Sequence, residues 1–368
     1  MLVGDDEMSS LILYLTVFVA ATYFIAKSTI YKNIYNIVCI IGMMILIVFA
    51  AGRFHVGTDM NTYMNMFERY STYTWPEFFA NIDSDLLFAI ISKITYSLGG
   101  RVLTWGTFAF LIVFPVYTTL RKQYPDASLG VAFFAFLCLY YALSFNITRQ
   151  FIAIAIIFWG MKFVFQNRLI PFLLVVIVAT GFHVSAPIAF LVWFLWNHKE
   201  NCAVKGRKRI AFLIGVAILV FLYQSAIEFV TNNIDALSSY ASYAETSTIG
   251  QNRDLYLNLL ELAVLLFFKR FLCKKDEKND FMYSLLIISV MIGFTGFLHP
   301  QVKRMAYYFS MPSKLVLLGN LQYGFTKNSR MGARVLICVY VVAYFILTIY
   351  ILGESNLIPY RFDLFSEW

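Results

Sequence analysis

Hydrophobic runs of about 18 to 20 residues recur along almost the whole chain, which is the length that a helix needs to cross a bilayer. The runs follow one another too closely to leave room for a separate soluble domain. Of the 368 residues, 60% are hydrophobic and 14% are charged, whereas soluble domains carry roughly a quarter of charged residues. We therefore expect an all-α polytopic integral membrane protein, with residues 1–368 forming one transmembrane domain.

The runs predict about twelve transmembrane helices. They lie at approximately 9–26, 34–51, 102–119, 127–145, 148–166, 169–182, 184–197, 210–230, 254–271, 281–298, 304–320 and 333–352. The first run follows three acidic residues, the wrong charge for a cleavable signal peptide, so we expect it to be the first span. In the apolar stretch 169–197, Gly181, His183 and Pro187 interrupt the pattern and predict two short helices that meet at His183.

Lysine and arginine set the predicted orientation. The loops 198–209 and 269–278 carry five basic residues each, which assigns both to the cytoplasm. Segment 85–98 then conflicts with the alternation of sides if it spans the membrane. Because its apolar run is about 13 residues long, it is too short to span, and we expect an interfacial helix on the outer face. The outer segments are then 53–101, containing this helix, and 231–253, with both termini external.

Charge and cysteine content argue against other classes of function. The net charge of +8 is explained by basic cytoplasmic loops, so no nucleic-acid partner is expected. The five cysteines are scattered without a CxxC pair, which indicates neither a disulfide framework nor a metal site.

Polar residues gather at the predicted outer ends of the spans. These candidates are Arg53, His55, Asp59, Asn146, Arg149, His183, Arg253, His299, Lys303 and Arg304. A single arginine at a span end is usually an interfacial anchor, and a single histidine beside a helix break is usually a satisfied polar residue. However, three of the four histidines and several arginines converge on one face, from which the positive-inside rule should have thinned arginine. We therefore favour a functional interpretation of the set.

The residue types indicate a phosphate-bearing ligand at the outer bilayer surface. Guanidinium groups pair two phosphate oxygens at once, so several arginines there suit a lipid-linked phosphate or diphosphate. Asp59 and His183 could move protons. No carboxylate cluster suggests a bound metal, and no cofactor is expected. The many aromatic residues would suit a sugar-binding groove, although aromatic belts are ordinary in membrane proteins.

Several short motifs, in order along the chain, resemble the EpsG-type branch of the Wzy polysaccharide polymerases. They are Arg53…Val56-Gly57-Thr58-Asp59…Tyr63, Phe145-Asn146…Arg149-Gln150…Ala153, His183-x-Ser185-Ala186, Arg304…Tyr307-Tyr308-Phe309 and the late Ile358-Pro359-Tyr360-Arg361-Phe362. Each motif alone is weak, but together they cover nearly the whole chain.

The resemblance implies a fold and a reaction. The fold would resemble a GT-C-type membrane glycosyltransferase in the bacterial cytoplasmic (inner) membrane. The enzyme would move a growing glycan from undecaprenyl diphosphate onto an incoming lipid-linked repeat unit at the outer face, without a metal. Its partners would be lipid-linked oligosaccharide and polysaccharide, membrane lipid, and a chain-length regulator and flippase of the same pathway.

Site roles follow from the resemblance as hypotheses. Arg53, Arg149 and Arg304 would hold the diphosphate, and Arg253 would assist from the outer loop. Asp59 or His183 would be the base, with Asp59 favoured on charge grounds. Lys303, His299, Asn146, His55 and Tyr63 complete the predicted substrate-binding set.

Two other functions stay open. A lipid-linked oligosaccharide flippase would place its charges in mid-membrane, and a membrane O-acyltransferase would need its histidines at the inner face. The sugar, the linkage, the anomeric outcome, the type of surface glycan (capsule, O-antigen or exopolysaccharide) and the oligomeric state are not predicted.

Overall fold

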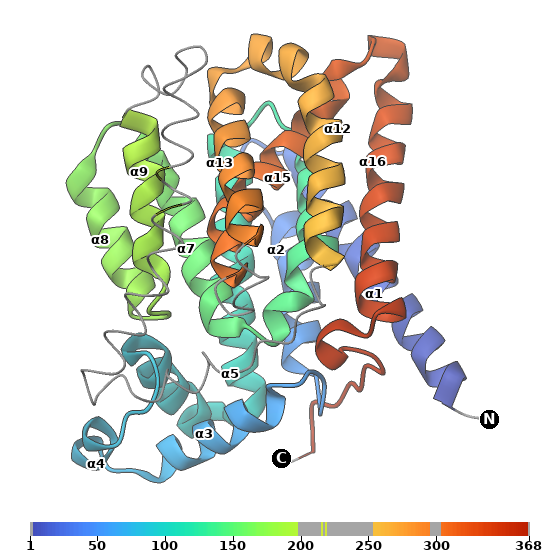
Figure 1. Ribbon diagram of the computed structural model, residues 1–368. Helices are drawn as coiled ribbons and strands as arrows, with labels where there is room; N and C mark the ends of the chain where they lie inside the picture. The colour runs from blue at the N-terminus through green and yellow to red at the C-terminus, as the bar shows by residue number, and fades with distance from the viewer. Residues whose placement is uncertain (1–2, 198–214, 216–217, 219–252, 295–302, 367–368) are drawn as a thin grey trace. The chain divides into compact units, whose positions relative to one another are not determined.

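A computed structural model of the protein describes residues 3–197, 215, 218, 253–294 and 303–366. The regular structure of these residues is helical, apart from one isolated β-bridge between Arg53 and Phe362. They belong to two compact units (Figure 1). The first unit contains Met1–Lys162, Ile170–Pro187 and Leu318–Trp368, and the second contains Phe163–Leu169 and Ile188–Leu317.

The expected all-α polytopic membrane protein is confirmed. Among the described residues, four helices are long and apolar enough to cross a membrane: Asp6–Ile30, Leu86–Gln123, Thr148–Phe165 and Lys327–Ile351. Ile37–Ala51, Leu129–Tyr141, Leu169–Thr180 and Ala186–Asn197 are shorter apolar helices. The total of about twelve spans stays a prediction, because the run 210–230 and the loops 198–209 and 231–253 lie almost wholly outside the described residues.

Long helices form the first unit. α1 (Val3–Lys27) packs on α2 (Ile37–Ala51) and α6 (Leu129–Phe136), and α2 packs on α5 (Leu86–Gln123). α16 (Arg330–Phe345) packs on α6. The Asn36 side chain caps α2 by accepting a hydrogen bond of 3.0 Å from the Cys39 N–H, which satisfies an otherwise unpaired helix donor.

Helix α5 is broken by a glycine pair. Gly99 and Gly100 have non-helical dihedrals, and Gly100 has φ +57° and ψ −151°, a conformation open almost only to glycine. The helix over Leu86–Leu98 is therefore separated by a kink from the long apolar helix that follows. That it is interfacial and does not span the membrane stays a prediction. Beside it lie α3 (Met60–Thr72), which packs on α5, and α4 (Trp75–Ala80) (Figure 1).

The segment after α16 returns to the loop after α2. Phe54 N donates to Arg361 O at 3.0 Å, and Asp363 N donates to Gly52 O at 2.7 Å. The Tyr360 ring stacks on Phe49 with centroids 4.3 Å apart. The motif at 358–362 therefore holds the backbone that carries Arg53.

The second unit contains α9 (Phe190–Asn197), α12 (Arg253–Lys275), α13 (Glu277–Phe294) and most of α15 (Tyr307–Leu321). Lys269 and Asp280 bridge α12 and α13 at 2.7 Å. Lys314 of α15 pairs with Glu261 of α12, both nearly inaccessible, and donates to Asn258 Oδ1 at 2.7 Å. A lysine within an apolar helix is thus neutralised by an acidic partner, as burial requires.

Candidate functional site

Arg53 lies in a cage of aromatic rings in the first unit. Its side chain is 2% exposed, and its guanidinium carbon lies 3.8 Å from the Trp105 ring centroid and 4.4 Å from that of Phe145. No hydrogen-bond partner is found for Nε or Nη1, and no carboxylate of the described residues pairs with this cation. A buried guanidinium with unmet donors is costly, which makes Arg53 a candidate for binding an anionic ligand.

The loop that presents Arg53 is fixed on both sides. Arg101 donates to Arg53 O at 2.8 Å and to Asp363 O at 2.8 Å, which ties the loop to the C-terminal segment. Gly57 has φ +97°, and a Cβ there would lie 2.2 Å from Asn146 Oδ1. The sequence motif Val56-Gly57 therefore reflects a backbone conformation and a close approach that only glycine permits.

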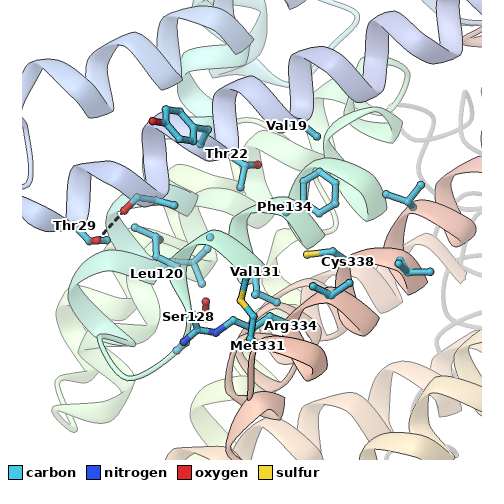
Figure 2. Close-up of a pocket in the computed structure, with 18 of the residues that line it drawn as sticks. Val19, Thr22, Thr29, Leu120, Ser128, Val131, Phe134, Met331, Arg334 and Cys338 are labelled. Atoms are coloured by element: carbon cyan, nitrogen blue, oxygen red, sulfur yellow. Dashed lines mark hydrogen bonds between the residues drawn. The ribbon is translucent and has the colours of Figure 1, made fainter. Parts of the chain in front are cut away.

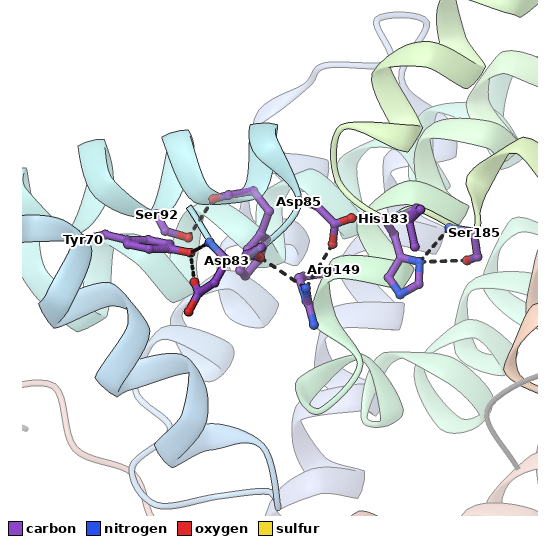
Figure 3. Close-up of polar contacts among 10 residues, drawn as sticks. Tyr70, Asp83, Asp85, Ser92, Arg149, His183 and Ser185 are labelled. Carbon is purple, nitrogen blue, oxygen red and sulfur yellow. Dashed lines mark hydrogen bonds and ion pairs between the residues drawn. The ribbon is translucent and has the colours of Figure 1, made fainter. Parts of the chain in front are cut away.

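Arg149 is held by an aspartate that the sequence did not single out. Arg149 Nη1 lies 3.1 Å from Asp85 Oδ2 and 3.2 Å from Ser84 Oγ (Figure 3). The Asp85 carboxylate is 7% exposed, while the Arg149 side chain keeps 31% of its surface exposed. In this ion pair the Asp85 carboxylate is therefore buried, whereas the Arg149 guanidinium is partly accessible.

Asp85 also joins the helix break at Gly181 to the start of α5. Its Oδ1 accepts a hydrogen bond of 3.0 Å from Val184 N, and Gly181 O accepts one of 2.7 Å from Leu87 N. The second contact satisfies a donor at the N-terminus of α5. Together the two contacts set His183 beside the Arg149–Asp85 pair (Figure 3). Burial raises the pKa of Asp85 above its ordinary value, more than Arg149 and the Val184 N–H lower it.

His183 has a defined tautomer in this geometry. Its Nδ1 lies 3.2 Å from Ser185 N and 2.8 Å from Ser185 Oγ. Because a backbone N–H can only donate, Nδ1 accepts, and a neutral imidazole then carries its proton on Nε2. In that state Nε2 of His183 is a hydrogen-bond donor and cannot act as a base.

Tyr63 connects the two arginines. Its buried ring lies edge-on to Trp105 with centroids 5.6 Å apart, on the indole that also contacts Arg53. Tyr63 also interacts electrostatically with Arg53, Arg149 and Asp59. The predicted residues Arg53, Tyr63, Arg149 and His183 thus belong to one connected network.

Three other predicted residues lie in the first unit with different surroundings. Asp59 is half-buried at the start of α3 and accepts a hydrogen bond of 3.0 Å from Thr58 Oγ1, without capping the helix. His55 is exposed, with φ +52°, and its ring lies edge-on to Phe54. Buried Asn146 donates 2.8 Å to Ser355 O, which gives it a contact in the scaffold.

The remaining predicted residues are not in the first unit. Lys303 and Arg304 are half-buried at the start of η7 (Arg304–Ala306) in the second unit, and Arg253 is the first residue of α12. His299 lies outside the described residues. Their roles stay predictions.

Sequence reasoning missed Asp85, Trp105 and Arg101. In the sequence, Asp85 served only as the boundary of a predicted helix, and Trp105 and Arg101 resembled ordinary interfacial residues. The pairing of Asp85 with the 181–187 break joins Asp85 to Val184, 99 residues further along the chain, for which no local pattern exists. In the part of the chain that the structure describes, no group of three or more His, Cys, Asp or Glu side chains is placed to hold a metal ion.

Comparison with known proteins gives one family. The model of the EpsG family matches residues 36–362, which is most of the chain. No curated protein and no solved structure matched, so the resemblance to GT-C-type enzymes stays an expectation. Family membership indicates a membrane protein of exopolysaccharide biosynthesis. On the extent of this match, the chain belongs to the EpsG family.

Proposed function

We propose that the protein is a surface polysaccharide polymerase. It transfers a glycan chain from undecaprenyl diphosphate to a hydroxyl of an incoming undecaprenyl-diphosphate-linked repeat unit, at the outer face of the cytoplasmic membrane. The bond between the anomeric carbon and the diphosphate oxygen breaks, a glycosidic C–O bond forms, and undecaprenyl diphosphate leaves. The acceptor hydroxyl loses its proton to a base on the protein.

The observation that carries the proposal is the unpaired, buried guanidinium of Arg53 beside the network of Tyr63 and Arg149. A departing diphosphate develops negative charge, and preorganised donors in a water-poor site stabilise such charge strongly. Arg53 supplies donors that no described protein group uses. Arg149 supplies a second, partly exposed cation.

Asp85 and His183 complete the arrangement. Asp85 is a positioning residue, because it holds Arg149 and the Val184 backbone at once. With Nδ1 accepting, His183 would donate a hydrogen bond through Nε2 to the substrate. Asp59, half-buried and next to Tyr63, is then the favoured base. The roles of Arg253, Lys303, Arg304 and His299 rest on the sequence resemblance alone.

Deleting the gene in its host tests the proposal. Loss of a polymerase should leave a single repeat unit on the surface or on the lipid carrier. If no repeat unit reaches the outer face, the protein is instead a flippase. If full-length chains lack a substituent, it is an O-acyltransferase.

Complementation with point variants tests the site. Arg53→Met and Arg149→Ala should each lower polymer yield by about a hundredfold or more, as loss of charge stabilisation predicts. Arg69→Ala is the matched control, because Arg69 pairs with Asp83 near α3 outside the Arg53–Tyr63–Arg149 network. If Arg69→Ala is as damaging, or Arg53→Met polymerises normally at equal membrane level, the site assignment is wrong.

A further inference from the structure

A long groove lies on the first unit, between α1, the α5–α6 connection with α6, and α16 (Figure 2). Its volume is about 1330 Å³, larger than the roughly 300–1,000 Å³ of ordinary small-molecule sites. Most of its lining is aliphatic or aromatic, including Val19, Val131 and Phe134. None of the residues in the proposed polymerase site lines it.

The groove lies on helices that are candidate membrane spans. These are α1 and α16, which border it. On the same helices, Val19 is 57% and Val339 60% exposed, as expected for side chains that face lipid. A groove open to acyl chains and lined by apolar side chains is a place for a lipid tail rather than for water.

One end of the groove is cationic. Arg334 of α16 and Arg121, near the end of α5, line the groove together with Ser128; Arg334 and Ser128 are labelled in Figure 2. Arg334 Nε contacts Gln322, and Arg121 Nη2 donates 3.0 Å to Tyr31 O, so both side chains are fixed in place. Two oriented guanidinium groups and a hydroxyl suit a phosphate group.

The dimensions match one leaflet. The lining runs from Val19 to Thr29 on α1 and from Met331 to Ile346 on α16, which is about 15 Å and about 22 Å at 1.5 Å per residue. Half of the hydrocarbon core measures about 15 Å. A lipid with its phosphate at Arg334 would therefore extend its tails towards the middle of the bilayer.

The groove is separate from the polymerase site along α1. The N-terminal half of α1 contacts the C-terminal segment that holds Arg53, because Ser10 Oγ accepts from Tyr360 N at 2.8 Å and Tyr14 donates to Leu357 O at 3.2 Å. The groove begins only at Val19 and continues to the other end of the helix. The basic end belongs to the side predicted to be cytoplasmic.

We propose that this groove binds one anionic phospholipid of the cytoplasmic leaflet, with its phosphate held by Arg121 and Arg334 and its acyl chains between α1, α6 and α16. The site is independent of the proposed polymerase reaction. An anionic lipid is favoured over a neutral one because two cations, Arg121 and Arg334, line the groove and no acidic side chain of the described residues does.

Native mass spectrometry of the full chain, released from nanodiscs of phosphatidylcholine with phosphatidylglycerol, tests the proposal. The wild-type protein should retain about one phosphatidylglycerol, and Arg121→Gln with Arg334→Gln should lower its retention by about tenfold or more. Lys327→Ala is the control, because Lys327 lies near α16 but does not line the groove.

A second variant shows whether loss of the lipid comes from the groove itself rather than from misfolding of the arginine variant. Val339→Trp keeps both arginines and fills the groove from an exposed, lipid-facing position, so it should also displace the lipid. Unchanged retention in both variants would overturn the proposal. So would equal retention of phosphatidylcholine, or preferential retention of an added polyprenyl phosphate over phosphatidylglycerol.

Discussion

The Arg53 guanidinium lowers the stability of the folded chain unless a ligand accepts its hydrogen bonds. Its flat faces contact Trp105 and Phe145, which provides cation–π stabilisation, but Nε and Nη1 remain without hydrogen-bond acceptors. Each unmet buried donor costs about 1–3 kcal/mol. Such a residue is explained by a ligand that supplies the acceptors.

Replacing Arg53 by methionine should therefore separate stability from activity. The free energy of unfolding should stay unchanged or rise by about 1–3 kcal/mol, because an apolar chain of similar length removes unmet donors from an aromatic cage. Polymer formation should be lost. Thermal unfolding in detergent and glycan analysis of complemented cells measure the two effects. A variant that loses both stability and activity would show that Arg53 is structural.

Asp85 should control activity at acidic pH. Burial raises the pKa of Asp85, so the ion pair with Arg149 is lost as the pH falls through a value above that of an exposed aspartate, about 4. Polymerisation by isolated membranes should therefore decline on mild acidification. Asp363 cannot cause this decline, because hydrogen bonds from Ser366 and from the Phe365 N–H lower its pKa to about 2.

The variant Asp85→Asn tests that assignment. It keeps an acceptor for Val184 N but has no proton to bind, so its lower activity should no longer depend on pH on the acidic side. The matched control is Asp83→Asn, which removes the exposed partner of Arg69 and should retain the wild-type acidic decline. An unchanged acidic decline in Asp85→Asn would assign the titration to another group.

Individual site residues were predictable to different degrees. Arginines on the predicted outer face were informative, and the structure connects two of them, Arg53 and Arg149, through Tyr63. Asp85 was not predictable, because an acidic residue before a helix usually caps it, whereas this carboxylate contacts Arg149 and Val184. Asn146 carries no local signal for its bond to Ser355 across the fold.

At the scale of elements, hydrophobic pattern and glycine position carried most of the information. The sequence prediction of a break at Gly181–Pro187 is confirmed: α8 (Leu169–Thr180) ends there and η4 (Ala186–Ala189) begins after it. The return of the C-terminal segment onto the loop after α2 was not predicted. Its contacts are a β-bridge and backbone hydrogen bonds of irregular segments, which produce no hydrophobic periodicity in the sequence.

The loop at Gly57 allows a double-mutant test. Gly57→Ala should destabilise the protein by more than about 2 kcal/mol, since it combines a positive φ with a clash against Asn146 Oδ1. Adding Asn146→Ala removes the clash, so the double variant should be less damaged than the sum of the two single variants. Thermal unfolding of the four proteins measures the coupling. Simple additivity would mean that the amide does not lie over Gly57.

The break in α5 can be tested by backbone conformation alone. A Cβ at Gly100 would meet nothing within 4 Å, so Gly100→Ala should cost about 1–3 kcal/mol through its φ of +57°. Gly332, in α16, also has open space but ordinary dihedrals, so Gly332→Ala should instead stabilise by about 0.5–1 kcal/mol. If both variants unfold alike, the kink is not a feature of the folded protein.

At the scale of the whole molecule, the first unit has two chemically different ends. One end carries Arg53, Arg149 and Asp85, and the other carries Arg121 and Arg334 beside the apolar groove. Charge alone could not distinguish them, since both are cationic. The density of basic loops predicts which end is cytoplasmic, and on this prediction the proposed polymerase site lies at the outer surface.

Cysteine labelling in intact cells tests this orientation. Asn81→Cys, exposed after α4, should react with a membrane-impermeant maleimide from outside, whereas Asn33→Cys and Asn328→Cys should react only after permeabilisation. The unsubstituted chain is the control for its own cysteines, and equal membrane levels exclude misfolding. If Asn33→Cys or Asn328→Cys is labelled in intact cells and Asn81→Cys is protected, the orientation in the membrane is the opposite of the predicted one. The Arg53 site would then face the cytoplasm, where a polymerase that uses exported lipid-linked repeat units could not act.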